Sequence, residues 1–536
     1  MRNGTTGRVI FPDGCFSSGR VRIWAGRERM KPMYRRLLLA FAGVALAAIP
    51  AAAQRSCESL TQLALPNVTI SLATPVAAGQ FTPPGAGAGV EVPAFCRVAG
   101  VVAPEIRFEL WMPVQWNRTL MAVGNGGLAG SINFRQMVEP LERGYASGST
   151  DTGHQGAASD ATWALGHMQR VIDFAHRSVH VMAEADKAVV AAFYGARPAH
   201  SYFSGCSQGG QQALILAQRY PQDFDGIVAG DPANFWTHNQ ISHLWTVLST
   251  QGDNYIPASK VAALAEAVNR ACDSLDGIAD GILNDPRRCH FDPATQLCAG
   301  GDGPRCLTAA QVDAVKKLYQ GPGASIYPGL LPGGETGPGG WGNWITGPRP
   351  GASGHGNLGL PFFKYIVFED PNWDVRSFRF ETAAGFDNDV QFLDEKLSTI
   401  FNATNTDLSA FRDHGVKLIH YHGWSDPDIT PLNSVDYYES VARTTASTSA
   451  FYRLFMVPGM QHCGGGPGPA KFDMVAALEH WVEHGTAPER IVASHVTAEG
   501  TVDRTRPLCP YPQEAQWKGA GSTDEAQNFV CAAPKR

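Results

Sequence analysis

The sequence predicts an α/β fold in which a largely parallel sheet is interrupted by a large inserted domain. Between residues 93 and 231, short apolar runs that end in Gly-rich loops alternate with helix-like stretches. The alternation is lost from about residue 232 to 410, where Trp-rich and Gly/Pro-rich stretches gather, and it returns after residue 411. Strands that alternate with helices are typical of a parallel sheet covered on both faces. We therefore assign residues 54–231 and 411–536 to one α/β domain and residues 232–410 to a lid domain.

The individual elements follow from apolar periodicity and from the Gly and Pro residues that bound each run. The predicted strands are residues 119–123, 201–204, 224–230, 416–421 and 452–457. The predicted helices are residues 170–194, 211–219, 431–444 and 471–484.

The N-terminal region contains the three parts of a secretory signal peptide. Residues 33–53 have a basic start, an apolar run and an Ala-x-Ala end. The apolar run, residues 37–49, is shorter than the roughly 20 residues that span a bilayer, so we expect no membrane anchor. Residues 1–32 precede this signal and are interpreted as an extension from a misplaced start. We expect a secreted or periplasmic protein whose mature chain begins near Gln54.

Composition limits the classes of partner and the chemistry of the cysteines. The chain has 536 residues, a net charge of −6 and no Lys/Arg cluster, which argues against nucleic-acid binding. Of its 11 cysteines, Cys15 lies in the N-terminal extension. An even number remains, which predicts disulfides in an exported protein. The absence of a Cys-x-x-Cys pair disfavours a structural zinc site.

One short run predicts a catalytic nucleophile. The run from Gly205 to Gly209 reads Gly-Cys-Ser-Gln-Gly and lies between a strand-like and a helix-like segment. In α/β-hydrolases this pattern places the serine on a strained turn at the end of a strand. The following helix points its N-terminus at the serine, which favours developing negative charge. Ser207 is therefore the predicted nucleophile of an α/β-hydrolase.

A serine nucleophile needs a base and an orienting acid, which follow it in the chain order Ser, acid, His. Asp426 and His462 stand after two late predicted strands and occupy these positions. Alternatives remain open: Asp231 and Asp428 for the acid, and His420 and His422 for the base. For the oxyanion hole we expect the amide of Gln208 and one from an earlier loop, where Gly127 is the first choice and Gly126 stays open.

Two cysteines flank the predicted pair of Ser207 and His462. Cys206 immediately precedes the serine and Cys463 immediately follows the histidine. If the two catalytic side chains are hydrogen-bonded, their cysteine neighbours lie within disulfide reach. A Cys206–Cys463 bond would then tie the nucleophile to the base.

A loop in the predicted lid suits a hard cation. Asp273, Asp276 and Asp280 follow one another at spacings of three and four, with glycines that allow tight turns. Calcium takes such oxygen ligands. The loop is too short for an EF-hand and lacks its terminal Glu. We expect a structural Ca²⁺ here, and a solvated acidic loop is the alternative.

The motifs together resemble the tannase/feruloyl esterase family, which also includes terephthalate monoester hydrolases. The resemblance rests on Cys206-Ser207, Asp426 and His462-Cys463 and covers about residues 57–531. It implies an α/β-hydrolase core with a lid inserted before the acid strand. It also implies that the backbone carbonyls of Ile278 and Ile282 complete the calcium site. The remaining disulfides that it implies are Cys57–Cys96, Cys272–Cys289, Cys298–Cys306 and Cys509–Cys531.

The expected activity is that of a serine carboxylesterase acting on small aromatic-acid esters through an acyl-enzyme. Feruloyl (hydroxycinnamoyl) esters are the first choice, ahead of galloyl esters and terephthalate monoesters. A terephthalate site would need a cation, and Arg349, Arg376 and Arg379 are lid candidates. A non-catalytic exported binding protein is the remote alternative. The lid aromatics that could stack on a phenolic ring, or form lid core, are Trp236, Trp245, Trp341, Trp344, Phe362, Phe363 and Phe368.

Overall fold

The computed structural model describes residues 55–85, 87–323, 325–380 and 388–534, which all fall in one compact unit. The predicted signal peptide and the extension before it lie outside the described residues. No helix in the described ranges is both long enough and apolar enough to cross a membrane.

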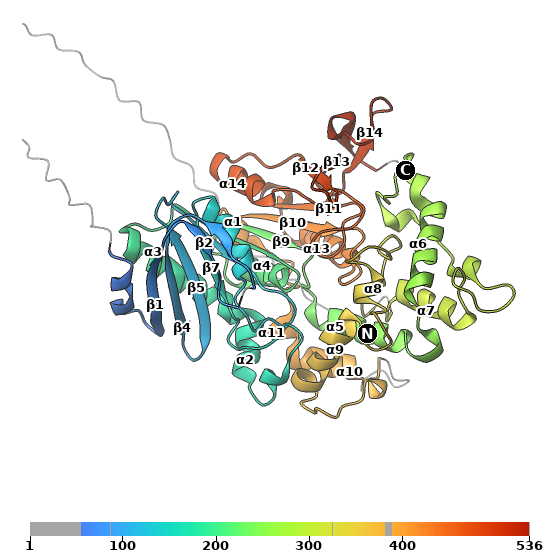
Figure 1. Ribbon diagram of the computed structural model, residues 1–536, viewed down its shortest axis with the longest axis horizontal. Coiled ribbons are helices and arrows are strands. Elements are labelled where there is room, and N and C mark those ends of the chain that lie inside the picture. Colours follow the sequence, from blue (N-terminus) through green and yellow to red (C-terminus); the bar gives the residue numbers. More distant parts are fainter. Residues whose placement is uncertain (1–54, 86, 324, 381–387, 535–536) are drawn as a thin grey trace, which may run out of the picture. The chain divides into compact units, whose positions relative to one another are not determined.

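A nine-stranded mixed sheet forms the centre of the fold (Figure 1). Its first strands pair antiparallel, and from β7 onward each neighbour runs parallel. The predicted parallel strands are present, whereas the antiparallel portion was not predicted. In spatial order the strands are β1 (Val68–Val76), β4 (Phe95–Val102), β5 (Ile106–Pro113), β7 (Ala146–Thr150), β6 (Thr119–Val123), β8 (His200–Cys206), β9 (Gly226–Gly230), β10 (Lys417–Gly423) and β11 (Tyr452–Val457).

Helices cover both faces of this sheet. Successive residues of a strand point to opposite faces, so neighbouring side chains of one strand pack under different helices. On β8, Tyr202 packs into the cluster beneath α1 (Phe134–Glu142) and α14 (Met474–His484). Its neighbour Phe203 packs into the opposite cluster. The helices of that second face are α3 (Ser178–Tyr194), α4 (Gln208–Arg219) and α13 (Pro431–Thr444), with α2 (Met168–Ile172) running into α3 through a π-helical turn.

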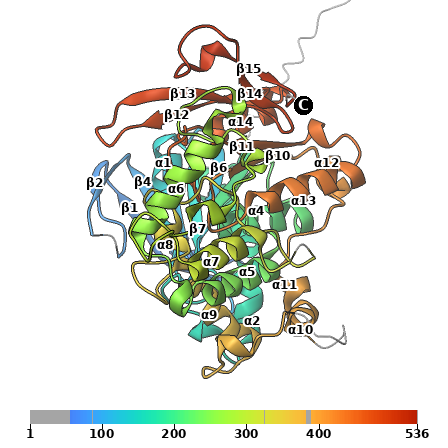
Figure 2. The same ribbon diagram turned by 90° about the vertical axis from the view of Figure 1, so that its right-hand side faces the viewer.

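The lid is inserted between two neighbouring strands, β9 and β10, so the sheet stays continuous across it. Figure 2 shows several of its green and yellow helices grouped together. Trp341 is fully buried in a cluster made of lid residues, and Phe362 in a second cluster where the lid packs on Trp163 and Phe174 of the α/β domain. The helices between β9 and β10 are α5 (Trp236–Ser249), α6 (Ala258–Cys272), α7 (Ala309–Gln320), α8 (Trp341–Trp344), α9 (Gly354–Pro361), α10 (Asp389–Leu393), α11 (Thr399–Phe401) and α12 (Ser409–Asp413).

Three small hairpins and five disulfides complete the structure. The hairpins pair β2 (Gly79–Phe81) with β3 (Val90–Val92), β12 (Ile491–Val496) with β13 (Val502–Leu508), and β14 (Glu514–Trp517) with β15 (Phe529–Ala532). The disulfides join the expected partners: Cys57–Cys96, Cys206–Cys463, Cys272–Cys289, Cys298–Cys306 and Cys509–Cys531.

Candidate active site

Ser207 lies on a strained turn between β8 and α4. Its φ of 66° and ψ of −122° are rare for a residue with a side chain, and such strain gathers at functional sites. A Cβ on Gly205 would lie 2.5 Å from the carbonyl oxygen of Gly209, and a Cβ on Gly209 would lie 2.9 Å from that of Asn125. The flanking glycines are therefore required by contact between backbones.

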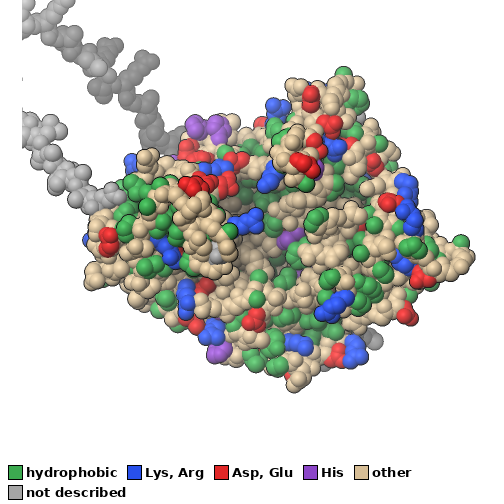
Figure 3. All heavy atoms as spheres, in the orientation of Figure 1, with side chains coloured by type: hydrophobic (Ala, Val, Ile, Leu, Met, Phe, Trp, Pro, Cys, Tyr) green, Lys and Arg blue, Asp and Glu red, His purple; other side chains and the backbone are tan. Residues whose placement is uncertain are grey.

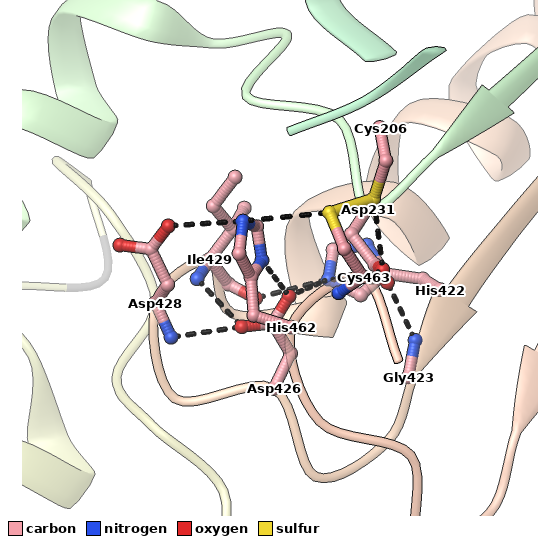
Figure 4. Close-up of a disulfide and its surroundings, with 9 residues drawn as sticks. All are labelled: Cys206, Asp231, His422, Gly423, Asp426, Asp428, Ile429, His462 and Cys463. Carbon is pink, nitrogen blue, oxygen red and sulfur yellow. Dashed lines mark hydrogen bonds and ion pairs between the residues drawn. A yellow bond between two sulfur atoms is a disulfide. The ribbon is translucent and has the colours of Figure 1, made fainter. Parts of the chain in front are cut away.

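Asp426 and His462 form a direct hydrogen bond at the ends of β10 and β11. His462 Nδ1 lies 2.8 Å from Asp426 Oδ2 (Figure 4). The other oxygen of Asp426 accepts the amides of Asp428 at 2.8 Å and Ile429 at 3.0 Å. The carboxylate is thus held in one orientation and fixes the imidazole in turn.

The second ring nitrogen of His462 faces another carboxylate. His462 Nε2 lies 3.2 Å from Asp428 Oδ2. Ser207 and His462 line one cavity of about 350 Å³. Among the described contacts, no hydrogen bond joins the two side chains. Burial alone would lower the pKa of His462, but the Asp426 and Asp428 carboxylates raise it to about 10. Catalytic hydrogen bonds are often incomplete before substrate binds.

Asp231, a rival for the acid, instead braces the disulfide beside the serine. One of its oxygens accepts the Gly423 amide at 2.7 Å. The other accepts the Cys463 amide at 2.8 Å and lies 3.3 Å from Cys206 Sγ. Burial raises the pKa of Asp231 to about 6. It makes no hydrogen bond to His462 among the described contacts, so Asp426 is the carboxylate that orients the imidazole.

The two rival bases are buried and occupied by structural hydrogen bonds. His420 contacts the hydroxyls of Tyr452 and Ser434 at 2.7 and 2.8 Å. His422 contacts Ser434 Oγ at 2.6 Å and the Ile429 carbonyl at 2.9 Å. His422 Nε2 also lies 3.2 Å from Asp426 Oδ2, so this ring helps to hold the Asp426 carboxylate in place.

The cavity at Ser207 combines backbone amides, amide side chains and one aromatic residue of the lid. Figure 3 shows a hollow near the centre of one face of the molecule, with a histidine side chain inside it. Gly126 and Gly127 both line the Ser207 cavity, so both oxyanion candidates reach it. The remaining lining residues include Asn125, Asn133, Gln136, Trp344, Tyr421 and His462.

Of the seven aromatic candidates in the lid, only Trp344 lines this cavity. Its ring stands edge-on to that of His462, with centroids 5.1 Å apart. Trp341 and Phe362 belong instead to the lid core. No Lys or Arg lines the cavity among the described residues. The expected arginines lie elsewhere: Arg376 pairs with Asp374 and Arg379 with Asp389, and Arg349 is exposed.

In the acidic loop of the lid, residues 273–282, side-chain carboxylates accept hydrogen bonds from the loop's own backbone amides. Asp273 Oδ1 accepts the amides of Asp280 and Gly281 at 3.2 and 2.9 Å. Burial and the charges of its two acidic neighbours raise the pKa of Asp276 to about 6. Arg506 lies 2.8 Å from Asp280 Oδ2. Arg504 lies 3.8 Å from the same oxygen and donates to the Asp280 carbonyl at 3.2 Å. Two arginines thus face three carboxylates.

Sequence reasoning missed several residues around the site. Asp428 was considered only as a rival acid, but it lies on the Nε2 side of His462. Its other oxygen faces His243 and His355, which come from lid helices and which no sequence motif indicated. The polar residues Asn133 and Gln136 come from the loop and helix after β6, where a Gly-rich run was the only available signal.

Comparison with known proteins gives the site its context. A family profile described as tannase and feruloyl esterase matches residues 90–532. An uncharacterised esterase of Xanthomonas campestris pv. campestris is 41% identical, covering 94% of this chain and 95% of the relative. The mono(2-hydroxyethyl) terephthalate hydrolase of Piscinibacter sakaiensis is 35% identical, covering 91% and 93%. The crystal structure of feruloyl esterase B from Aspergillus oryzae aligns with a TM-score of 0.80 at 28% identity, covering 89% of this chain and 99% of that one.

The mixed sheet with its covering helices is an α/β-hydrolase fold, as in the aligned feruloyl esterase. The family match extends over the serine turn, the lid and the acid and base loops. This protein belongs to the tannase and feruloyl esterase family of carboxylic ester hydrolases.

Proposed function

We propose that the protein is an exported serine esterase that hydrolyses esters of aromatic acids, with Ser207 as nucleophile, His462 as base and Asp426 as orienting acid. The observation that carries this proposal is the Asp426–His462 hydrogen bond beside the cavity that Ser207 lines. A binding protein without catalysis would have no need of a strained serine in the same cavity as an oriented imidazole.

The chemistry is acyl transfer in two halves. When His462 turns its Nε2 from Asp428 to Ser207 Oγ, it leaves one of the carboxylates that raise its pKa and releases its extra proton to solvent. The neutral ring then takes the Ser207 proton as the serine attacks the ester carbonyl. The amides of Gln208 and Gly127 stabilise the oxyanion, and His462 then protonates the departing alcohol. Water repeats the attack on the acyl-enzyme. Asp426 stays ionised throughout, because its two histidine neighbours outweigh burial and lower its pKa.

Feruloyl-type esters are the proposed substrates. Trp344 supplies an aromatic surface beside His462, and Asn133 and Gln136 can bond ring hydroxyl or methoxy groups. The described lining of the Ser207 cavity contains no cation, but the adjoining cavity, which shares Asn133 and Gln136 with it, is lined by Arg135, Arg143 and Lys471. A terephthalate monoester, whose second carboxylate needs a cation, therefore stays an alternative. Galloyl esters need partners for three ring hydroxyls and remain the second candidate.

Export and a calcium ion are two further parts of the proposal. Five disulfides suit an oxidising compartment. Calcium would be held by the carboxylates of Asp273, Asp276 and Asp280 with the carbonyls of Ile278 and Ile282. The donor set supports this, since all five ligands are oxygens and three carboxylates against the two arginines Arg504 and Arg506 leave the loop negatively charged.

Replacing Ser207 with Ala tests the proposed mechanism. We expect kcat for a chromogenic aryl acetate to fall at least about 10⁴-fold, since the nucleophile is lost. An unchanged rate would refute Ser207 as the nucleophile. Comparing kcat/KM for methyl ferulate, methyl gallate and a terephthalate monoester tests the substrate, and a preference for either of the last two would replace the feruloyl proposal.

A further inference from the structure

We propose that His243, His355 and Asp428 form a binding site for a divalent transition metal, most simply Zn²⁺. The site would join two lid helices to the loop that carries the catalytic acid. It is separate from the acidic calcium loop, and its existence does not depend on which ester the enzyme hydrolyses.

The distances between the donor atoms suit a metal with four ligands. Asp428 Oδ1 lies 3.2 Å from His243 Nε2 and 3.5 Å from His355 Nε2. One donor atom from each of the three residues lies within 4.8 Å of the others. Zinc bonds to His and Asp are roughly 2.0–2.2 Å long, so neighbouring ligands of a tetrahedral ion stand roughly 3.3–3.5 Å apart. Two imidazoles and one carboxylate are also a ligand set that zinc prefers.

Hydrogen bonding does not explain this arrangement. Asp428 Oδ1 and His355 Nε2 are buried and make no hydrogen bond, although they stand 3.5 Å apart. Both ring nitrogens lie within ion-pair distance of this oxygen, but neither makes a well-aligned hydrogen bond to it. Polar atoms left unpaired in a protein interior need an explanation, and a shared cation is one. The side chains are almost fully buried, with exposed fractions of 1% for His243, 0% for His355 and 3% for Asp428.

The lid is packed so that these atoms meet. His243 lies on α5 and His355 on α9, and their rings stack with centroids 4.1 Å apart and planes 25° apart. An ion lies in the plane of each imidazole that binds it, so one ring must turn about its Cβ–Cγ bond when the metal binds. A Cβ on Gly359 would lie 2.9 Å from the Cβ of His243, so only glycine lets the two helices approach this closely. The close packing of α5 against α9 thus brings two imidazoles to one carboxylate.

A fourth ligand is available one helical turn before His243. The Asn239 amide nitrogen lies 3.4 Å from His243 Nε2, and its amide oxygen is buried without a partner. The two ends of an amide exchange by a half-turn, which directs the oxygen to the place where the metal would lie. Asn239 would then complete a coordination of two imidazoles, one carboxylate and one amide oxygen.

The Asp428 carboxylate connects the proposed metal site to His462, the proposed catalytic base. Asp428 directs Oδ2 at His462, and its other oxygen points away from the triad (Figure 4). A metal bound on that outer side would fix the carboxylate that His462 contacts. It would also hold α5 and α9 against the acid loop.

Metal binding by the full chain tests the proposal without using activity. The purified protein is saturated with Ca²⁺ to occupy the acidic loop, exposed to Zn²⁺ or Co²⁺ and desalted. We expect one Zn²⁺ per chain by elemental mass spectrometry, a visible absorption band from tetrahedral Co²⁺, and a Zn²⁺-dependent rise in Tm. His355→Gln should weaken Zn²⁺ binding at least about 10-fold.

His484→Gln provides the matched control. His480 and His484 stack at 4.6 Å on the exposed side of α14 and are a surface pair that could bind Co²⁺ adventitiously. Stoichiometric binding that survives His484→Gln and is lost in His355→Gln supports the site. Loss in His484→Gln, equal binding in all three proteins, or a wild type that retains no Zn²⁺ overturns it. The wild-type stoichiometry and Tm shift decide the question even if His355→Gln does not fold.

Discussion

The indole ring of Trp344 meets the imidazole of His462 edge to face, with their centroids 5.1 Å apart. Trp344 belongs to α8 of the lid, whereas His462 follows the last strand of the sheet. The lid therefore contributes directly to the wall of the cavity that Ser207 lines. An aromatic acyl group bound there would lie against the indole and next to the base.

Replacing Trp344 with Ala should weaken aromatic substrates selectively. Loss of stacking area of this kind corresponds to about 1.5–3 kcal/mol, so kcat/KM for methyl ferulate should fall about 10- to 100-fold, mainly through KM. An aryl acetate, with its small acyl group, should be affected less. The control is Trp245→Phe, because Trp245 packs on Phe380 away from this cavity. Equal losses for both substrates would argue against stacking.

Replacing Asp426 with Asn should lower kcat about 10⁴-fold with little change in KM. The amide cannot stabilise the imidazolium and favours the wrong ring tautomer. Asp413→Asn, on the exposed end of α12, controls for a general effect of losing one carboxylate. Should the Asp426 variant retain more than about a tenth of the wild-type kcat in a steady-state assay, the acid would have to be another residue.

Stability should fall as the pH rises, because of a buried carboxyl outside the site. Asp151 is 2% exposed, its Oδ2 has no partner, and burial raises its pKa to about 7. In the unfolded chain this carboxyl has its ordinary pKa near 4. Between about pH 4 and 7 the folded protein therefore keeps a proton on Asp151 that the unfolded chain has lost, so stability falls as the pH rises through this range. Its contribution to stability is complete below that window and is lost as pH rises through 7.

Replacing Asp151 with Asn removes this pH dependence. The variant should melt higher than wild type at pH 8.5, by an amount corresponding to about 1–3 kcal/mol, and should match it more closely at pH 5. Thermal unfolding at the two pH values measures the difference. A variant less stable than wild type at pH 8.5 would mean that the carboxyl is needed in its ionised form.

Calcium should stabilise the protein through the lid. Adding a chelator should lower Tm and adding back Ca²⁺ should restore it, because the ion binds only the folded loop. Asp276→Asn should lower Tm and remove the response to Ca²⁺, whereas the exposed Asp253→Asn should keep it. Identical melting of wild type with chelator and with Ca²⁺ would exclude a structural ion at this loop.

The parallel strands around the site could be predicted because their sequence signals are local. β8, β10 and β11 are apolar runs that end in Gly-rich or Asp/His-rich loops, so Ser207, Asp426 and His462 could be assigned to one edge of the sheet. The antiparallel strands β1, β4 and β5 were not predicted. Their pairing depends on contacts between segments rather than on any single apolar run.

The lid's contribution could not be predicted because it depends on how helices pack. Seven aromatics were equal candidates in the sequence, and burial in the lid clusters removes residues such as Phe362 and Phe363 from consideration. His243 and His355 lie far apart in the chain and meet only because α5 and α9 pack closely. Asp428 could be seen as acidic, but its place on the far side of His462 follows from the fold of one loop.

The disulfide between Cys206 and Cys463 closes a ring of chain around the entire lid. The bonded residues are 257 positions apart, and the lid lies wholly between them. A single protease cut in an exposed lid loop would leave two fragments covalently joined, since one carries Cys206 and the other carries Cys463. The lid can therefore be nicked without separating the fragment that carries Ser207 from the one that carries His462.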